Sequence, residues 1–177
     1  MTQLAMLRLT ALSLTCFGAS VQATPCPETT NLQQLSAWDA YRNSGPYDLA
    51  SVTQARAVLS AKRMHVVLTN TDVTATTVAN HITVSQVNQP GQLALDLVLS
   101  NASKPLVPGS YSAHSKDRFG QSVSTTLMIP GTASGIWADD GTVEVLAIDD
   151  QHICGRFSLS GKLGETSGSF VATIEAP

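Results

Sequence analysis

The chain has 177 residues, of which 43% are hydrophobic and 13% are charged, and its formal charge is −3 at pH 7. This length suits one domain with one core, and the hydrophobic fraction excludes a chain that is disordered throughout. Because basic side chains are not in excess, the sequence argues against a phosphate-binding surface, and we expect no nucleic acid as a partner.

The N-terminal segment 1–23 is typical of a secretory signal peptide. Its first eight residues carry one basic side chain and no acid, residues 9–19 are apolar, and Val21-Gln22-Ala23 fits the pattern that signal peptidase reads. The apolar run is too short, and too interrupted by hydroxyl side chains, to span a bilayer. We expect cleavage after Ala23, a periplasmic or secreted location, and no transmembrane segment in the mature chain.

Residues 24–46 form the next segment, which is turn-rich at both ends and has a few apolar residues in its middle. This composition predicts an N-terminal arm or a short helix around Leu32 and Trp38. The arm carries Cys26, and signal cleavage leaves Cys154 as the other cysteine of the mature chain. In an oxidising compartment, two such cysteines favour one disulfide.

Residues 47–177 predict a β domain, because runs of Val, Thr, Ser, Leu and Ile are broken by Gly, Pro, Asn and Asp about every ten residues. The alternation is clearest in residues 92–100, where Leu93, Leu95, Leu97 and Leu99 share one face. Further strands are expected at residues 52–59, 64–68, 82–85, 111–115, 122–129, 143–148, 152–159 and 169–174. The expected fold class is all-β: a mainly antiparallel β-sandwich, or a flattened barrel, of about eight or nine strands in a meander.

Strand phase predicts where the disulfide lies. In residues 152–159, Ile153, Phe157 and Leu159 share the apolar face, so Cys154 points to the outer face. We therefore expect the disulfide to clamp the arm over the outside of the C-terminal strands. Loss of the disulfide should then free the arm before the β domain unfolds.

The sequence lacks the common catalytic motifs. It has no phosphate-binding Gly-rich loop with Lys, no His-Glu-x-x-His and no Cys-x-x-Cys. The nearest match to a Gly-x-Ser-x-Gly elbow, residues 131–135, has its serine one position late, and we interpret it as a flexible turn. These features predict a non-catalytic protein without a cofactor.

Three histidines are weak candidates for a metal site. His65, His114 and His152 fall in the polar phase of their strands, so they could converge on the outer face of the sheet as nitrogen ligands. Within one strand, however, none of them is paired at a ligand spacing. The simpler interpretation is three separate solvated histidines and no metal.

Two acidic pairs offer a further alternative. Asp139-Asp140 and Asp149-Asp150 flank the strand at 143–148, so they lie at its opposite ends. Such pairs are common in hairpin turns, but oxygen ligands in tight loops also suit calcium. If acids from separate loops converged in a cleft, the protein would instead be a hydrolase.

Trp137, Tyr111 and Phe119 are candidates for a binding rim. They stand at or near segment ends, where a sandwich presents its loops. Aromatic side chains at such a rim often anchor partners, although they also cap the ends of a β core.

Several turn-and-strand segments of the second half resemble uncharacterised exported bacterial β-sandwich proteins. They are Pro108-Gly109-Ser110-Tyr111, Gly141-Thr142-Val143-Glu144-Val145, Ile153-Cys154-Gly155-Arg156-Phe157-Ser158-Leu159 and Ser167-Gly168-Ser169-Phe170. The resemblance implies a β-sandwich of the cell envelope and supplies no catalytic residue. The sequence thus predicts an exported binding or interaction protein, whose partner is an unknown protein or small ligand. A metal-binding periplasmic protein and a hydrolase with loop carboxylates remain the alternatives.

Overall fold

The structure, a computed structural model, describes residues 24–35, 47–80, 86–114, 120–130, 132–136, 138–161 and 164–176. Several features expected from the sequence lie outside these residues. They are the signal peptide at 1–23, Trp38, the strand at 82–85, Phe119 and Trp137.

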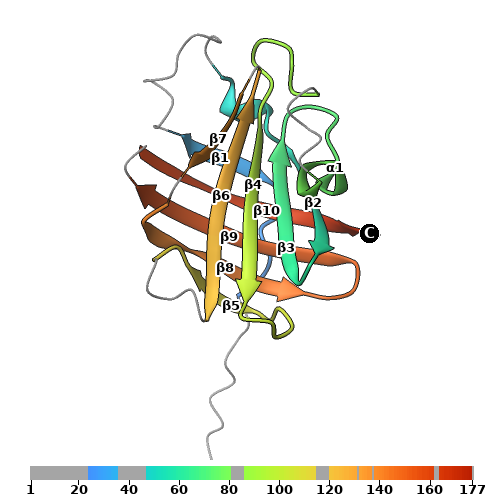
Figure 1. The fold of residues 1–177 in the computed structure, drawn as a ribbon, viewed down its shortest axis with the longest axis vertical. Helices are drawn as coiled ribbons and strands as arrows, with labels where there is room; N and C mark the ends of the chain where they lie inside the picture. The colour runs from blue at the N-terminus through green and yellow to red at the C-terminus, as the bar shows by residue number, and fades with distance from the viewer. Residues whose placement is uncertain are drawn as a thin grey trace, which may run out of the picture.

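Ten strands form within the described residues (Figure 1). In chain order they are β1 (Asn31–Leu35), β2 (Gln54–Ser60), β3 (Arg63–Thr69), β4 (Ala94–Asn101), β5 (Gly109–Ser112), β6 (Gln121–Ile129), β7 (Thr132–Ile136), β8 (Asp140–Ile148), β9 (His152–Gly161) and β10 (Gly164–Glu175). The helices of the described chain are both short: a 3-10 helix at Leu49–Ser51 and α1 at Ala75–Ala79. The expected all-β class is confirmed.

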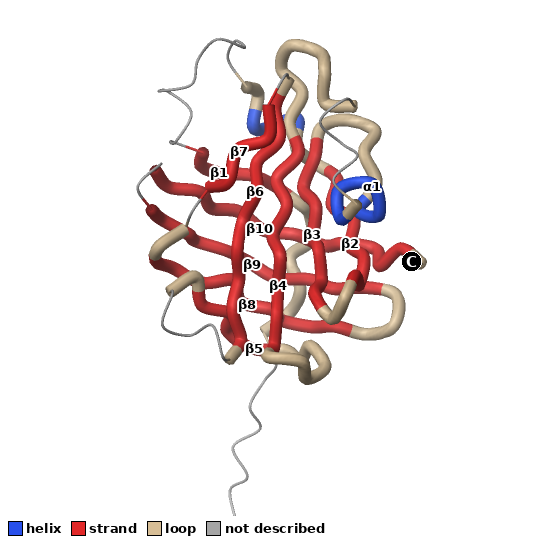
Figure 2. Tube along the Cα trace, viewed as in Figure 1, coloured by secondary structure: helices blue, strands red, loops and turns tan. Residues whose placement is uncertain are grey.

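Eight of these strands close into a ring, which makes the β domain a barrel. The hydrogen-bonded order is β10, β2, β3, β4, β6, β5, β8 and β9, and β9 pairs with β10 again. In Figure 1, β3, β4 and β6 run lengthwise in front, while β8, β9 and β10 cross behind them. The barrel is therefore flattened into two crossing layers, both made of strands (Figure 2).

Two short parallel contacts join the two layers. β10 pairs with β2 through residues 173–175 and 56–58, and β5 pairs with β6 only through Ser112 and Ser122. The expected meander is wrong at this second contact, because β5 follows β4 in the chain but lies between β6 and β8. Parallel neighbours cannot be joined by a tight hairpin, so the order in the chain and the order in the sheet differ there.

The barrel interior is filled by apolar side chains. The predicted leucine row is confirmed: Leu93, directly before β4, and the leucines at 95, 97 and 99 within β4 are all 0% exposed. Tyr111 and Phe170 belong to the same cluster and are also fully buried. An eight-stranded barrel is just wide enough for side chains to fill it, so burial of this cluster is the main driving force for the fold.

A second apolar cluster, which the sequence did not predict, lies outside the main core. Val58 and Val67 of β2 and β3 pack there with Val78 of α1, and all three are nearly fully buried. The Oγ1 of Thr74 accepts the N–H of Thr77 at 3.1 Å and caps the helix. Helix α1 therefore covers the outer side of these two strands.

β1 and β7 stand outside the ring and correct two expectations. Residues 31–35, expected within an arm or short helix, form β1, which pairs antiparallel with β10 and buries Leu32 in the core. Residues 132–135, which belong to the segment expected as a flexible turn, are part of β7, which pairs antiparallel with β6. Each strand occupies the stretch of an edge that a short parallel contact leaves open, so backbone pairing decides its structure.

The expected disulfide between Cys26 and Cys154 is present, with the two Cα atoms 5.7 Å apart. Cys154 is buried but belongs to neither apolar cluster, as its predicted outward phase requires. The Oγ1 of Thr30 accepts the N–H of Val171 at 3.0 Å and donates to its carbonyl oxygen at 3.2 Å. The N-terminal segment therefore crosses the outer face of β9 and β10.

Candidate functional site

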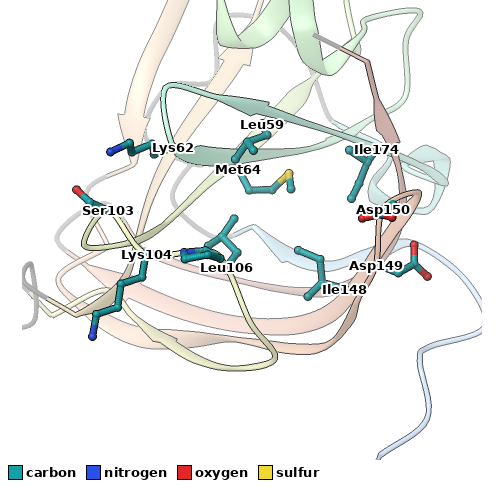
Figure 3. Close-up of a pocket in the computed structure, with 11 residues that line it drawn as sticks. Leu59, Lys62, Met64, Ser103, Lys104, Leu106, Ile148, Asp149, Asp150 and Ile174 are labelled. Atoms are coloured by element: carbon teal, nitrogen blue, oxygen red, sulfur yellow. The ribbon is translucent and has the colours of Figure 1, made fainter.

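The flattened barrel has a cavity of about 580 Å³, which we call the barrel mouth (Figure 3). Four segments that are distant in sequence line it: the β2–β3 hairpin, the loop after β4, the β8–β9 hairpin and the end of β10. The lining residues are Leu59, Lys62, Met64, Ser103, Lys104, Pro105, Leu106, Ile148, Asp149, Asp150 and Ile174.

The floor of the barrel mouth is apolar. Met64 is 3% exposed and belongs to the main core, and Leu106, Ile148 and Ile174 pack partly buried against it. Leu59, near the end of β2, is 51% exposed. Because these side chains continue the barrel core outward, the mouth offers a ligand apolar surface from several segments at once.

Two tight turns carry the basic residues of the barrel mouth. Ala61 and Lys62 have φ angles of 48° and 67°, and Ala102 and Ser103, just before Lys104, have φ angles of 41° and 73°. Left-handed positions of this kind are favoured by Gly and Asn, because a Cβ atom is crowded there. Both turns nevertheless have Ala, Lys or Ser at these positions and neither Gly nor Asn.

The second turn is also fixed by hydrogen bonds. The N–H of Lys104 donates to the carbonyl oxygen of Asn101 at 2.7 Å, and the Asn101 side-chain amide donates to the carbonyl oxygen of Pro105 at 2.7 Å. The backbone that carries Lys104 is therefore held from both sides of the turn.

The acidic residues of the barrel mouth belong to the β8–β9 hairpin. The Oδ1 of Asp149 accepts the N–H groups of Gln151 and His152, both at 2.7 Å. The hydrogen bond from Gln151, and next the one from His152, lower the pKa of Asp149 below its ordinary value, because both favour the charged carboxylate. The neighbouring Asp150 adds a second carboxylate.

The charges of the barrel mouth are separated across its floor. Figure 3 shows Lys62 and Lys104 at one side and Asp149 and Asp150 at the opposite side, with apolar side chains between them. Within the described residues, no ion pair joins the two sides. The site is therefore an apolar cavity with a basic side and an acidic side.

The structure does not bring the three candidate histidines together. His65 is 12% exposed, and its Nδ1 lies 2.7 Å from the Oδ2 of Asp96 on the neighbouring strand β4, a pair that the sequence did not predict. His114 is exposed just after β5, and His152 is exposed on β9. No group of three or more His, Cys, Asp or Glu among the described residues could hold a metal ion.

Tyr111, expected at a binding rim, lies instead in the core. It is 0% exposed, and its hydroxyl group donates to the carbonyl oxygen of Val107 at 2.9 Å and accepts the Val107 N–H at 3.1 Å. Its ring points into the barrel because it lies on the inner face of β5. Trp137 and Phe119, the other two residues of the expected rim, lie outside the described residues.

The two acidic pairs lie at opposite ends of β8, as expected. Asp140 begins the strand, and Asp149 follows its last residue, Ile148. The pair Asp149-Asp150 lines the barrel mouth and the pair Asp139-Asp140 does not.

Sequence reasoning missed the two lysines and the apolar floor. The available signal was a basic residue in or beside each of two turns that follow strong β segments, 60–63 and 101–104.

None of the described helices has the length and apolar character that crossing a membrane requires. Comparisons of this chain with family models, with curated proteins and with solved structures give no match.

Proposed function

We propose that this chain is an exported, non-catalytic binding protein of the cell envelope, which takes a small, partly apolar ligand into the barrel mouth. The observation that carries this proposal is an apolar cavity of about 580 Å³, whose floor continues the buried core of the barrel outward. Ligand sites are typically concave, mostly apolar and of this size, and the mouths of β-barrels are among their preferred places.

Two observations support export. The segment 1–23 has the pattern of a signal peptide. The Cys26–Cys154 disulfide is compatible with an oxidising compartment.

The binding role is tested with a neutral, environment-sensitive dye, whose fluorescence rises in an apolar site. The variant Leu59→Trp fills the barrel mouth from its exposed edge, and we expect it to weaken dye binding at least about tenfold, since the bulkier ring occupies the apolar volume. Val107→Trp is the matched control, because Val107 is also an exposed large apolar residue, at 45%, but does not line the mouth.

The expected result is strong dye binding by the wild type and by Val107→Trp, and weak binding by Leu59→Trp. Equal binding by all three proteins, or no binding by the wild type, would overturn the proposed function. Circular dichroism of each variant checks that the β fold is intact.

A further inference from the structure

We propose that the barrel mouth selects a zwitterion with an apolar middle, which places its anionic group beside Lys62 and Lys104 and its cationic group beside Asp149 and Asp150. This inference rests on the proposed function, because it names the ligand class of the same site. A short apolar peptide with free termini and an aminoalkyl carboxylate share this chemistry.

The first argument is the charge arrangement. The two ammonium groups and the two carboxylates lie at opposite sides of an apolar floor. Charges beside a low-dielectric surface interact more strongly than charges in bulk water. A zwitterion gains attraction at both sides, a monoanion gains it at one side, and a dianion is repelled at the acidic side.

The second argument is that three of these four charges have no charged partner within the described chain. Lys62, Lys104 and Asp150 form no ion pair among the described residues. The chain does pair charges close by, since Arg56 Nη1 lies 3.6 Å from Glu175 Oε1, directly after Ile174 of the mouth. The two lysines and Asp150 are therefore available to a ligand, whereas Oδ1 of Asp149 already accepts two N–H groups and lies 3.8 Å from Nδ1 of His152.

The third argument is the backbone beneath the lysines. Each of the two turns holds two consecutive L residues at positive φ, although an Asn-Gly turn would adopt this conformation without strain. Conformations of this kind concentrate at functional sites. The turns therefore present Lys62 and Lys104 at the mouth against the local preference of the backbone.

The size of the cavity limits the ligand. A volume of about 580 Å³ lies in the range of small-molecule sites and is too small for a folded partner. Three or four apolar residues of a peptide, or an alkyl chain of comparable volume, match it in order of magnitude.

The test uses trileucine in four forms: with free termini, N-acetylated, C-amidated, and capped at both ends. Each form competes with the neutral dye for the wild-type protein. We expect the free form to bind about two- to fivefold tighter than either singly capped form, because an exposed charge contact contributes this much. The preference should shrink as salt is added, since exposed charges are screened.

Variants assign each end of the ligand to its side of the mouth. The double variant Lys62→Met/Lys104→Met keeps the apolar stems, and it should abolish the preference for a free carboxylate while keeping that for a free amine. Asp150→Asn should weaken the preference for a free amine only. Arg156→Met, on the exposed outer positions of β9, is the control and should keep both preferences.

A second series compares an ω-amino alkanoate, an alkanoate and an α,ω-dialkanoate of equal chain length. Affinities that fall in this order support a zwitterion from a non-peptide source, and a preference seen only in the peptide series supports a peptide. If all ligands displace the dye equally, or if the preferences survive in the lysine and aspartate variants, the zwitterion inference is overturned while the proposed function stands. Failure of the dye itself to bind overturns the proposed function instead.

Discussion

Lys62 lies in a backbone conformation that its side chain does not favour. Its φ of 67°, after the φ of 48° at Ala61, makes the β2–β3 turn left-handed at two consecutive residues. Such a conformation disfavours an L residue by about 1–2 kcal/mol, and turns of this kind prefer Gly at the second position. Lys62 therefore lowers the stability of its turn relative to a glycine. Such a loss of stability is expected where a residue is needed for binding.

The variant Lys62→Gly separates these two roles. It removes the crowded Cβ, and we expect the free energy of unfolding in urea to rise by about 1 kcal/mol. The same variant removes one ammonium group, so affinity for peptides with a free carboxylate should fall. Lys62→Ala keeps the Cβ and should lower the affinity without the gain in stability. If both variants stabilise the protein equally, strain at this residue is not the cause.

At the scale of one element, the β8–β9 hairpin depends on the charge of Asp149. Its hydrogen bonds from Gln151 and His152 lower its pKa, so the ionised carboxylate stabilises the folded state. A lowered folded-state pKa gives stability that is present above the ordinary pKa of an aspartate and is lost as the pH falls through the lowered value.

We therefore predict that Asp149→Asn is less stable than the wild type near neutral pH, and that the difference disappears in acid. The asparagine oxygen still accepts both N–H groups, so this variant removes only the charge. Thermal unfolding of both proteins across the acidic range measures the effect. A difference that stays constant down to the lowest pH would show that the charge of Asp149 does not stabilise the hairpin.

The sequence predicted strands wherever alternation was strong, as in the leucine row of β4. The sequence did not predict β1 and β7, because these strands form by pairing with the open edges of β10 and β6. Their own residues show little of the apolar–polar alternation that indicates a strand. Helix α1 was missed because its five residues are too few for a helical period to be read. Gly155 of β9 is required by close packing, since a Cβ there would meet the Glu144 carbonyl oxygen and the Phe170 ring.

At the scale of the whole molecule, the barrel mouth joins four segments that are far apart in the chain. Each segment alone looks like an ordinary hairpin or strand end, so only the topology brings Lys62 and Asp149 to one cavity. The expectation that Tyr111 lies at a binding rim was wrong for a related reason. A position near a segment end does not show whether its side chain points into the barrel or outward. The type and position of a single residue in the sequence therefore do not predict a site whose residues are brought together only by the strand order.

The disulfide also acts on the whole molecule, because it joins positions 128 residues apart. The N-terminal segment is more than a clamped arm: Leu32 is in the core, and the Thr30 hydroxyl group binds both backbone groups of Val171. These contacts should hold β1 in place without the bridge. Removing the disulfide should therefore leave the folded state unchanged and act on the unfolded chain, which gains conformational freedom.

We predict that Cys26→Ala/Cys154→Ala lowers the free energy of unfolding in urea by up to about 5 kcal/mol, the loop-entropy limit for a loop of this length. Hydrogen exchange should show β1 amides that remain protected and open together with the rest of the barrel, because β1 is part of the sheet. Leu32→Ala in the disulfide-bonded protein is the matched comparison, since it weakens β1 and leaves the bridge. Rapid exchange of β1 at an unchanged global stability would show instead that the disulfide alone holds the N-terminal segment.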